Sequence, residues 1–121
     1  MVSGNAFVFF GLFDTADLDN FLDGIAFSTS APAHSDFGYI TEQGGSGAGG
    51  RTGVSLDTNW HNFRLVRTSS TRVDFYIDGS PVANTTSHFP TAPLMPLAMC
   101  GFGIDGPQGY LEVDDFILIP A

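Results

Sequence analysis

Five oxygen-bearing side chains crowd the stretch DTADLDNFLD, which runs from residue 14 to residue 23. They are Asp14, Asp17, Asp19, Asn20 and Asp23. Calcium prefers hard oxygen ligands gathered on a short turn, so this cluster is the candidate metal site. The stretch is not an EF-hand loop, because Phe21 stands where a third ligand would be needed and the closing glutamate is absent. We expect solvated turn residues and no cofactor, with a calcium ion as the alternative.

A second group of side chains has the chemistry to hold a sugar. Carbohydrate binding needs an aromatic platform with amide or carboxylate groups beside it. On the face turned away from the core, the candidates are Asn62, Arg64, Asp74 and Tyr76, and a loop near the C-terminus offers Asp105, Gln108 and Tyr110. Simple surface exposure of these side chains, without any ligand, is the alternative.

The histidines show neither a catalytic nor a metal-binding pattern. His34, His61 and His88 lie far apart, no serine stands in a G-x-S-x-G turn, and no His or Cys pair has ligand spacing. We expect His61 to pack against its neighbour Trp60, and the other two histidines to lie in loops. Cys100 is the single cysteine, so no internal disulfide can form.

Strands must position these side chains, because the apolar residues alternate or form short runs. Strand-like stretches occur at 6–13, 22–28, 37–42, 60–68, 71–79, 96–104 and 110–120, and a short return strand passes through Val82. The glycine-rich tract 43–53 is expected to be a flexible loop or an extension of a turn. We count eight or nine strands and no helix longer than one turn. The pattern predicts an all-β, antiparallel β-sandwich.

The clearest of these strands form two hairpins. Asp78-Gly79 tolerates the positive φ of a tight turn, so the chain can reverse there. The stretches 60–68 and 71–79 should pair antiparallel, with their apolar sets facing the same core. Arg64 then stands opposite either Asp74 or Tyr76, and the sequence does not choose between these two registers.

Composition and charge narrow the classes of partner. The 121 residues suffice for a single domain, 1–121, and 43% hydrophobic against 14% charged residues argues against disorder. The net charge of −9, with four arginines and no lysine, opposes binding to nucleic acid and to an anionic membrane surface. No apolar run approaches the roughly 20 residues of a membrane-spanning helix. We therefore expect neither nucleic acid nor membrane as a partner.

The segment 54–119 contains the stretches SLDTNWHNFRLVRTSSTRVDFYIDGSPVA, PTAPLMPLAM and LEVDDFILIP. It resembles the C-terminal half of the concanavalin A-like lectin/glucanase jelly rolls, a superfamily that includes laminin G-like domains. More narrowly, it is similar to modules of bacteriophage structural proteins, such as tail, fibre or head-decoration components. Residues 6–42 fit more loosely, as preceding strands. The resemblance implies a jelly-roll sandwich that is truncated on its N-terminal side, because members of the superfamily are commonly longer.

The resemblance also implies a function and a place. It points to a non-enzymatic structural and assembly module displayed on the surface of a virion, with an extracellular location as the alternative. A truncated sandwich leaves an edge uncovered, so the expected partners are other protein chains, in a homo-oligomer or in virion assembly. A lectin-like domain that binds glycans, with or without calcium, is the second hypothesis.

Catalysis is the weakest hypothesis. Glucanases of this superfamily carry two carboxylates on one strand in an E-x-D-x-E spacing, which points both at the same sugar. The nearest match here begins at Glu112, but Phe116 occupies the position of the second glutamate. We therefore expect no enzyme, and a degenerate glycoside hydrolase is kept as a third alternative.

Overall fold

Strands follow one another along the chain, as the alternating apolar residues predict. The computed structural model describes residues 6–15, 22–31, 34–57 and 59–102. Within these ranges the strands are β1 (Ala6–Phe13), β2 (Gly24–Ala31), β3 (Asp36–Gln43), β4 (Ser46–Ser55), β5 (Phe63–Ser69), β6 (Arg72–Ile77), β7 (Ser80–Thr85) and β8 (Met95–Phe102). The described residues form no helix, and so none that could cross a membrane. The all-β class is confirmed, while the strand expected at 110–120 lies outside the described residues.

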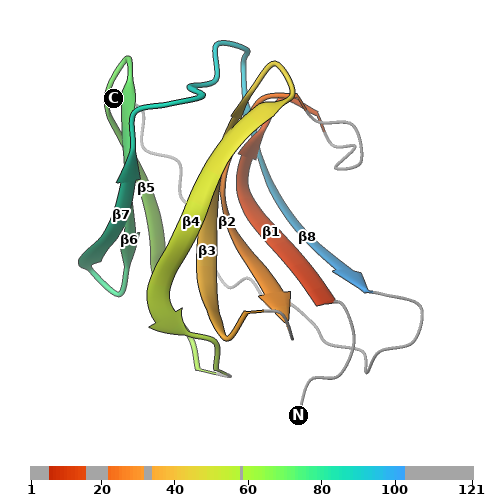
Figure 1. Ribbon diagram of the computed structural model, residues 1–121, viewed down its shortest axis with the longest axis vertical. Coiled ribbons are helices and arrows are strands. Elements are labelled where there is room, and N and C mark those ends of the chain that lie inside the picture. The colour runs from red at the N-terminus through yellow and green to blue at the C-terminus, as the bar shows by residue number, and fades with distance from the viewer. Residues whose placement is uncertain (1–5, 16–21, 32–33, 58, 103–121) are drawn as a thin grey trace.

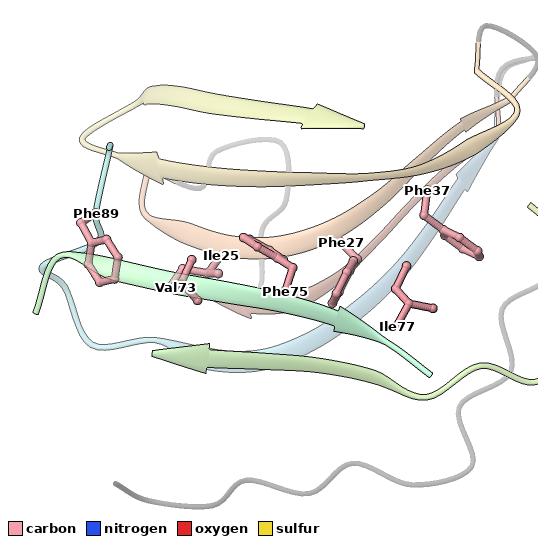
Figure 2. Close-up of a cluster of buried hydrophobic side chains, with 7 residues drawn as sticks. All are labelled: Ile25, Phe27, Phe37, Val73, Phe75, Ile77 and Phe89. Atoms are coloured by element: carbon pink, nitrogen blue, oxygen red, sulfur yellow. The ribbon is translucent and has the colours of Figure 1, made fainter. Parts of the chain in front are cut away.

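The strands form two antiparallel sheets that face each other (Figure 1). One sheet has five strands in the order β4-β3-β2-β1-β8, and the other has three in the order β5-β6-β7. Both sheets contribute to one hydrophobic cluster, whose side chains meet between them in Figure 2. The buried members are Ile25, Phe27, Phe37, Val73, Phe75, Ile77 and Phe89. The arrangement is therefore sandwich-like, with the core between the sheets.

Phe27 stands at the centre of this core and is fully buried. Its ring centroid lies 5.0 Å from that of Phe63 and 5.3 Å from that of Phe75, both nearly edge-on. Phe10 of β1 stacks on it at 5.5 Å. Such aromatic pairs add about 0.5–1.5 kcal/mol beyond the burial of their area. Phe10, Phe27, Phe63 and Phe75 therefore supply much of the described contact that joins the sheets.

The hairpins around β6 settle the register that the sequence left open. Arg64 of β5 lies opposite Tyr76 of β6, and their neighbours Leu65 and Phe75 pair on the core side. The turn from β6 to β7 uses Asp78, with a φ of 52°, and a glycine with a φ of 81°. Both values are positive, as the Asp-Gly pair predicts.

Of the two alternatives for the glycine-rich tract 43–53, the flexible loop is wrong, whereas a turn that continues into extended chain agrees with the structure. Gly44 and Gly45 form a two-residue turn with φ values of 59° and 81°, and the rest of the tract lies in β4. Two of its glycines lie against Tyr39 of β3. A Cβ on Gly49 would come within 2.4 Å of the Tyr39 carbonyl oxygen, and one on Gly50 within 2.8 Å of the Tyr39 hydroxyl. These glycines allow β3 and β4 to approach closely. From composition alone, the same glycines indicate a loop.

Candidate functional site

His61 fastens the loop before β5 with both of its ring nitrogens. Nδ1 lies 2.7 Å from Oδ2 of Asp78, and Nε2 lies 2.9 Å from Oδ1 of Asp57. Ionised carboxylates only accept hydrogen bonds, so both nitrogens must carry a proton and the ring is an imidazolium. The ring packs against Phe37 and Phe63, with centroid distances of 5.6 Å and 5.9 Å. We call this arrangement the Asp57–His61–Asp78 clamp.

The clamp shifts the pKa of each member toward its charged form. The pKa of His61 is raised, first by the hydrogen bond to Asp78 and then by the one to Asp57. The pKa of Asp78 is lowered chiefly by His61, with help from the Asn62 amide that donates to its Oδ1 at 2.9 Å. The pKa of Asp57 is lowered first by the amide of Asn59 and then by His61. The clamp is therefore complete only where both carboxylates are ionised and the imidazole is protonated.

Trp60, the only tryptophan of the chain, is 67% exposed between these held residues. The expected packing of His61 against Trp60 is wrong, because the imidazolium packs on two core phenylalanines instead. Behind Trp60 the amide of Asn59 donates to Asp57 at 2.7 Å, and ahead of it Asp78 donates to the Asn62 carbonyl oxygen at 2.8 Å. An exposed indole therefore sits on a loop whose backbone is fixed on both sides.

The four residues predicted for the outer face do not act as one set. Arg64 and Tyr76 do come together, with the guanidinium carbon 5.1 Å from the ring centroid. Asp74 is buried and bound by Arg72, whose Nε and Nη2 lie 3.0 Å and 2.8 Å from its Oδ1. This bond raises the pKa of Arg72. Asn62 directly precedes β5 and is exposed, as Arg64 is, whereas Asp74 is already paired with Arg72.

The acidic turn proposed for calcium is described only at its two ends. Asp23 is 6% exposed, and its carboxylate accepts three backbone amides: Gly44 at 2.8 Å, Thr91 at 2.9 Å and Ala92 at 3.1 Å. The Gly44 and Ala92 bonds lower the pKa of Asp23 against the opposing effect of burial. The three N–H donors compensate the negative charge of the Asp23 carboxylate, as a bound cation would. The described partners of Asp23 are therefore backbone amides of its own chain.

Asp14 uses its Oδ1 to accept the amide of Leu22 at 3.2 Å. Nearby, burial and then the charge of Asp14 raise the pKa of Glu42. The described residues contain no group of three or more His, Cys, Asp or Glu placed to hold a metal ion. Asp17, Asp19 and Asn20 lie outside them, so calcium binding at this turn stays a prediction.

The predicted sugar-binding loop also lies outside the described residues; its candidates are Asp105, Gln108 and Tyr110. The same is true of the stretch 112–116, which was compared with the carboxylate spacing of the glucanases. Comparisons with protein-family models, with curated proteins and with solved structures find no match to this chain. What the protein does must therefore be argued from its own strands and side chains.

Proposed function

We propose that the chain is a non-enzymatic structural module, which assembles with further copies of itself in a phage or phage-like particle. The resemblance of residues 54–119 to bacteriophage structural proteins supports the proposal that the module belongs to such a particle. The same resemblance is the reason for proposing a jelly-roll topology. The free edge of the five-stranded sheet supports self-assembly, and it is the observation that carries the proposal.

β4 is that edge, because within the described residues it is hydrogen-bonded to a strand on one side only, although β7 of the other sheet also lies close to it. Gln43 and Ser46 flank the two-residue turn, so they form a hydrogen-bonded pair. Pairs along an antiparallel ladder alternate, and the backbone groups of Gly47, Gly49 and Arg51 therefore point away from β3. Such a row of N–H and C=O groups is a template for pairing with another strand.

Between Ser46 and Arg51, β4 has little of the usual protection of an edge. Natural edge strands carry lysine, proline or a β-bulge; this part of β4 has no lysine and no proline, and the irregularity in its pairing with β3 lies beyond Arg51. Its one charged side chain, Arg51, is held by Asp36, with Nε 2.9 Å from Oδ1. The Gly53 amide and then Arg51 lower the pKa of Asp36, so the carboxylate stays ionised to a lower pH than a free aspartate does.

A second copy of the chain is the partner that fits this edge. Residues 43–56 contain no acidic side chain, whereas the whole chain carries a net charge of −9. Two copies therefore repel each other least where their β4 strands meet. Antiparallel pairing of two identical strands is self-complementary about a two-fold axis, and it would join the two five-stranded sheets into one.

The test is the solution mass by light scattering, with and without a calcium chelator. We expect a dimer or larger species that chelation leaves intact. Gly47→Pro removes an outward N–H and should give a monomer, while the matched control Gly47→Ala keeps the N–H and should still associate. A Cβ at this position meets the Glu42 side chain at 2.9 Å in both variants, so this contact is common to the two, and the proline differs by its ring and its missing N–H.

Circular dichroism should show that both variants keep their strands. A wild-type chain that is monomeric at all concentrations tested would overturn the assembly proposal. A monomer that loosens when calcium is removed would instead favour the lectin-like hypothesis.

A further inference from the structure

The three-stranded sheet is narrower than the five-stranded sheet that it faces. β7 lies close to β4, β6 lies over β2, and β5 lies over β1, where the Phe63 ring is 4.6 Å from that of Phe10. β8 continues the larger sheet past β1. Phe10 is only half-buried, and so are Val8 and Leu12 on the same side of β1. A further strand beside β5 would therefore bury apolar surface.

The backbone of β5 is open to such a strand. The Asp78 amide donates to the Asn62 carbonyl oxygen at 2.8 Å, so these two residues form a hydrogen-bonded pair. Pairs along the ladder alternate, and the backbone groups of Phe63, Leu65 and Arg67 therefore point away from β6. β5 contains no lysine and no proline, and the irregularity in its pairing lies beyond Arg67.

The charges of β5 indicate what kind of strand fits. β5 carries two arginines and no acidic residue. Arg64 lies on the outer side, opposite Tyr76, whereas Arg67 lies on the core side, with its guanidinium carbon 4.7 Å from the Phe89 ring centroid. Within the described ranges, neither arginine has a carboxylate partner. A strand that pairs with β5 should therefore carry a carboxylate on each of its faces.

The chain that follows β8 has the right direction to supply this strand. β6 follows the direction of β2, since Val73 lies near Ile25 and Phe75 near Phe27 (Figure 2). β5 and β1 are antiparallel to β6 and β2, and β8 is antiparallel to β1. A chain that turns back after Phe102 therefore runs parallel to β5.

The same chain is long enough to reach β5. Phe102 lies opposite Ala6, four residues before the Phe10 that Phe63 contacts. The four residues span about 13 Å along the strand, and stacked sheets are about 10 Å apart. Residues 103–110 can extend over about 26 Å. The residues that follow them can therefore begin beside Phe63.

The segment 110–119, YLEVDDFILI, matches β5 in charge and in apolar pattern, and it lies outside the described residues. Glu112 and Asp115 are three residues apart, as Arg64 and Arg67 are, so one parallel register joins both pairs. A slip of one residue would bring Glu112 beside an apolar side chain of β5. The register sets four pairs side by side: Phe63–Leu111, Arg64–Glu112, Leu65–Val113 and Arg67–Asp115.

We propose that residues 110–119 bind the free edge of β5 in their own chain, as a parallel fourth strand of the smaller sheet. The β5 edge of a second copy is a poorer partner, because it would bring arginines against arginines. The inference goes beyond the assembly proposal and does not depend on it, because β4 lies at the opposite edge of the larger sheet from β8. It covers the edge at β5, so that β4 remains for a second copy.

Cysteine crosslinking in the full chain tests the register. In a Cys100→Ser background, Val66→Cys and Asp114→Cys would lie side by side on the outer face. Paired strands are about 4.8 Å apart, within the roughly 4.4–6.8 Å that separate the Cα atoms of a disulfide. We expect this pair to oxidise within one chain, as measured by non-reducing electrophoresis and peptide mapping. The matched control, Val66→Cys with Asp115→Cys, has its second thiol on the opposite face and should oxidise at least about tenfold more slowly.

Hydrogen exchange tests the edge itself. The amides of Leu65 and Arg67 point away from β6, and a strand that accepts their hydrogen bonds should slow their exchange. Val113→Pro interrupts the added strand and should speed the exchange of these two amides by at least about tenfold. The matched control Val113→Ala keeps every N–H and should leave both amides protected. If Val113→Pro does not fold, as judged by circular dichroism, the cysteine pairs still decide.

Three results would overturn the proposal. A disulfide between two chains would place the segment on another copy. Equal oxidation of the two cysteine pairs, or oxidation of neither, would mean that the segment has no fixed register on β5. Unprotected amides at Leu65 and Arg67 in the wild type would show that the edge is free. Gly47→Pro separates the two proposals, because it should abolish assembly and leave the disulfide within the chain intact.

Discussion

At each end of the sandwich one charged side chain holds the loops by hydrogen bonds, and the two side chains have opposite charges. At one end, a single buried carboxylate, Asp23, accepts amides from the β3–β4 turn and from the segment that leads to β8 (Figure 1). At the other end, a single imidazolium, His61, donates to two carboxylates that are themselves largely exposed. Asp23 stays charged at every pH above its lowered pKa, whereas His61 loses its charge above its raised pKa. The end that contains the Asp57–His61–Asp78 clamp is therefore the one whose stability responds to alkaline pH.

Removing Asp23 should have the largest effect. Asp23→Ala leaves three amide donors without their acceptor, and we expect a loss of about 3 kcal/mol in the free energy of unfolding. Urea unfolding followed by circular dichroism measures it. The comparison residue is Asp14, whose carboxylate accepts one amide in an exposed position, so Asp14→Ala should cost less than about 1 kcal/mol. Equal losses in the free energy of unfolding for the two substitutions would show that the three hydrogen bonds of Asp23 stabilise the fold no more than the single one of Asp14.

The clamp predicts a smaller effect that depends on pH. The folded pKa of His61 is raised, so its contribution is complete below its unfolded pKa of about 6.5 and disappears as the pH rises through the folded value. The folded pKa values of Asp57 and Asp78 are lowered, so their contribution is present above about 3.9 and is lost as the pH falls. The window of full stabilisation thus lies between about pH 4 and pH 6.5.

We expect His61→Gln to cost about 1 kcal/mol at pH 6 and clearly less at pH 9. Asp23→Asn serves as the control, because its cost should be the same at both pH values. Unfolding in urea at the two pH values measures both variants. A cost of His61→Gln that does not change with pH would mean that the imidazole is not charged in the fold.

The alternation of apolar and polar residues was enough to predict the strand β6, but it did not predict β4. In β6 every second residue is large and apolar, so the buried face could be predicted before any partner was known. In β4 the glycines suggested a loop, and only their contact with Tyr39 shows why a strand needs them. A contact of that kind depends on a neighbouring strand, and no local pattern contains it.

The candidate site was predictable where strand pairing alone decides it. Arg64 and Tyr76 meet because their strands pair. Asp74 does not join them, because its carboxylate is bound by Arg72, two residues earlier on the same strand. Asp23 was predicted as a calcium ligand, and its amide donors come from positions 44, 91 and 92, which no spacing rule connects to it. Trp60 was missed because apolar side chains are expected inside. Its alternation with an inward-facing His61 was the signal that could have identified it.

The smallest effect on stability should come from Trp60, and this is what separates a recognition residue from a structural one. A tryptophan that is 67% exposed gives up little buried area when truncated, so Trp60→Ala should change the free energy of unfolding by no more than about 0.5 kcal/mol. Urea unfolding at pH 6 places this variant beside Asp23→Ala and His61→Gln. A cost above about 1 kcal/mol would mean that the indole packs against the fold. A neutral result would mean that the largest aromatic side chain of the chain lies in solvent and contributes little to folding.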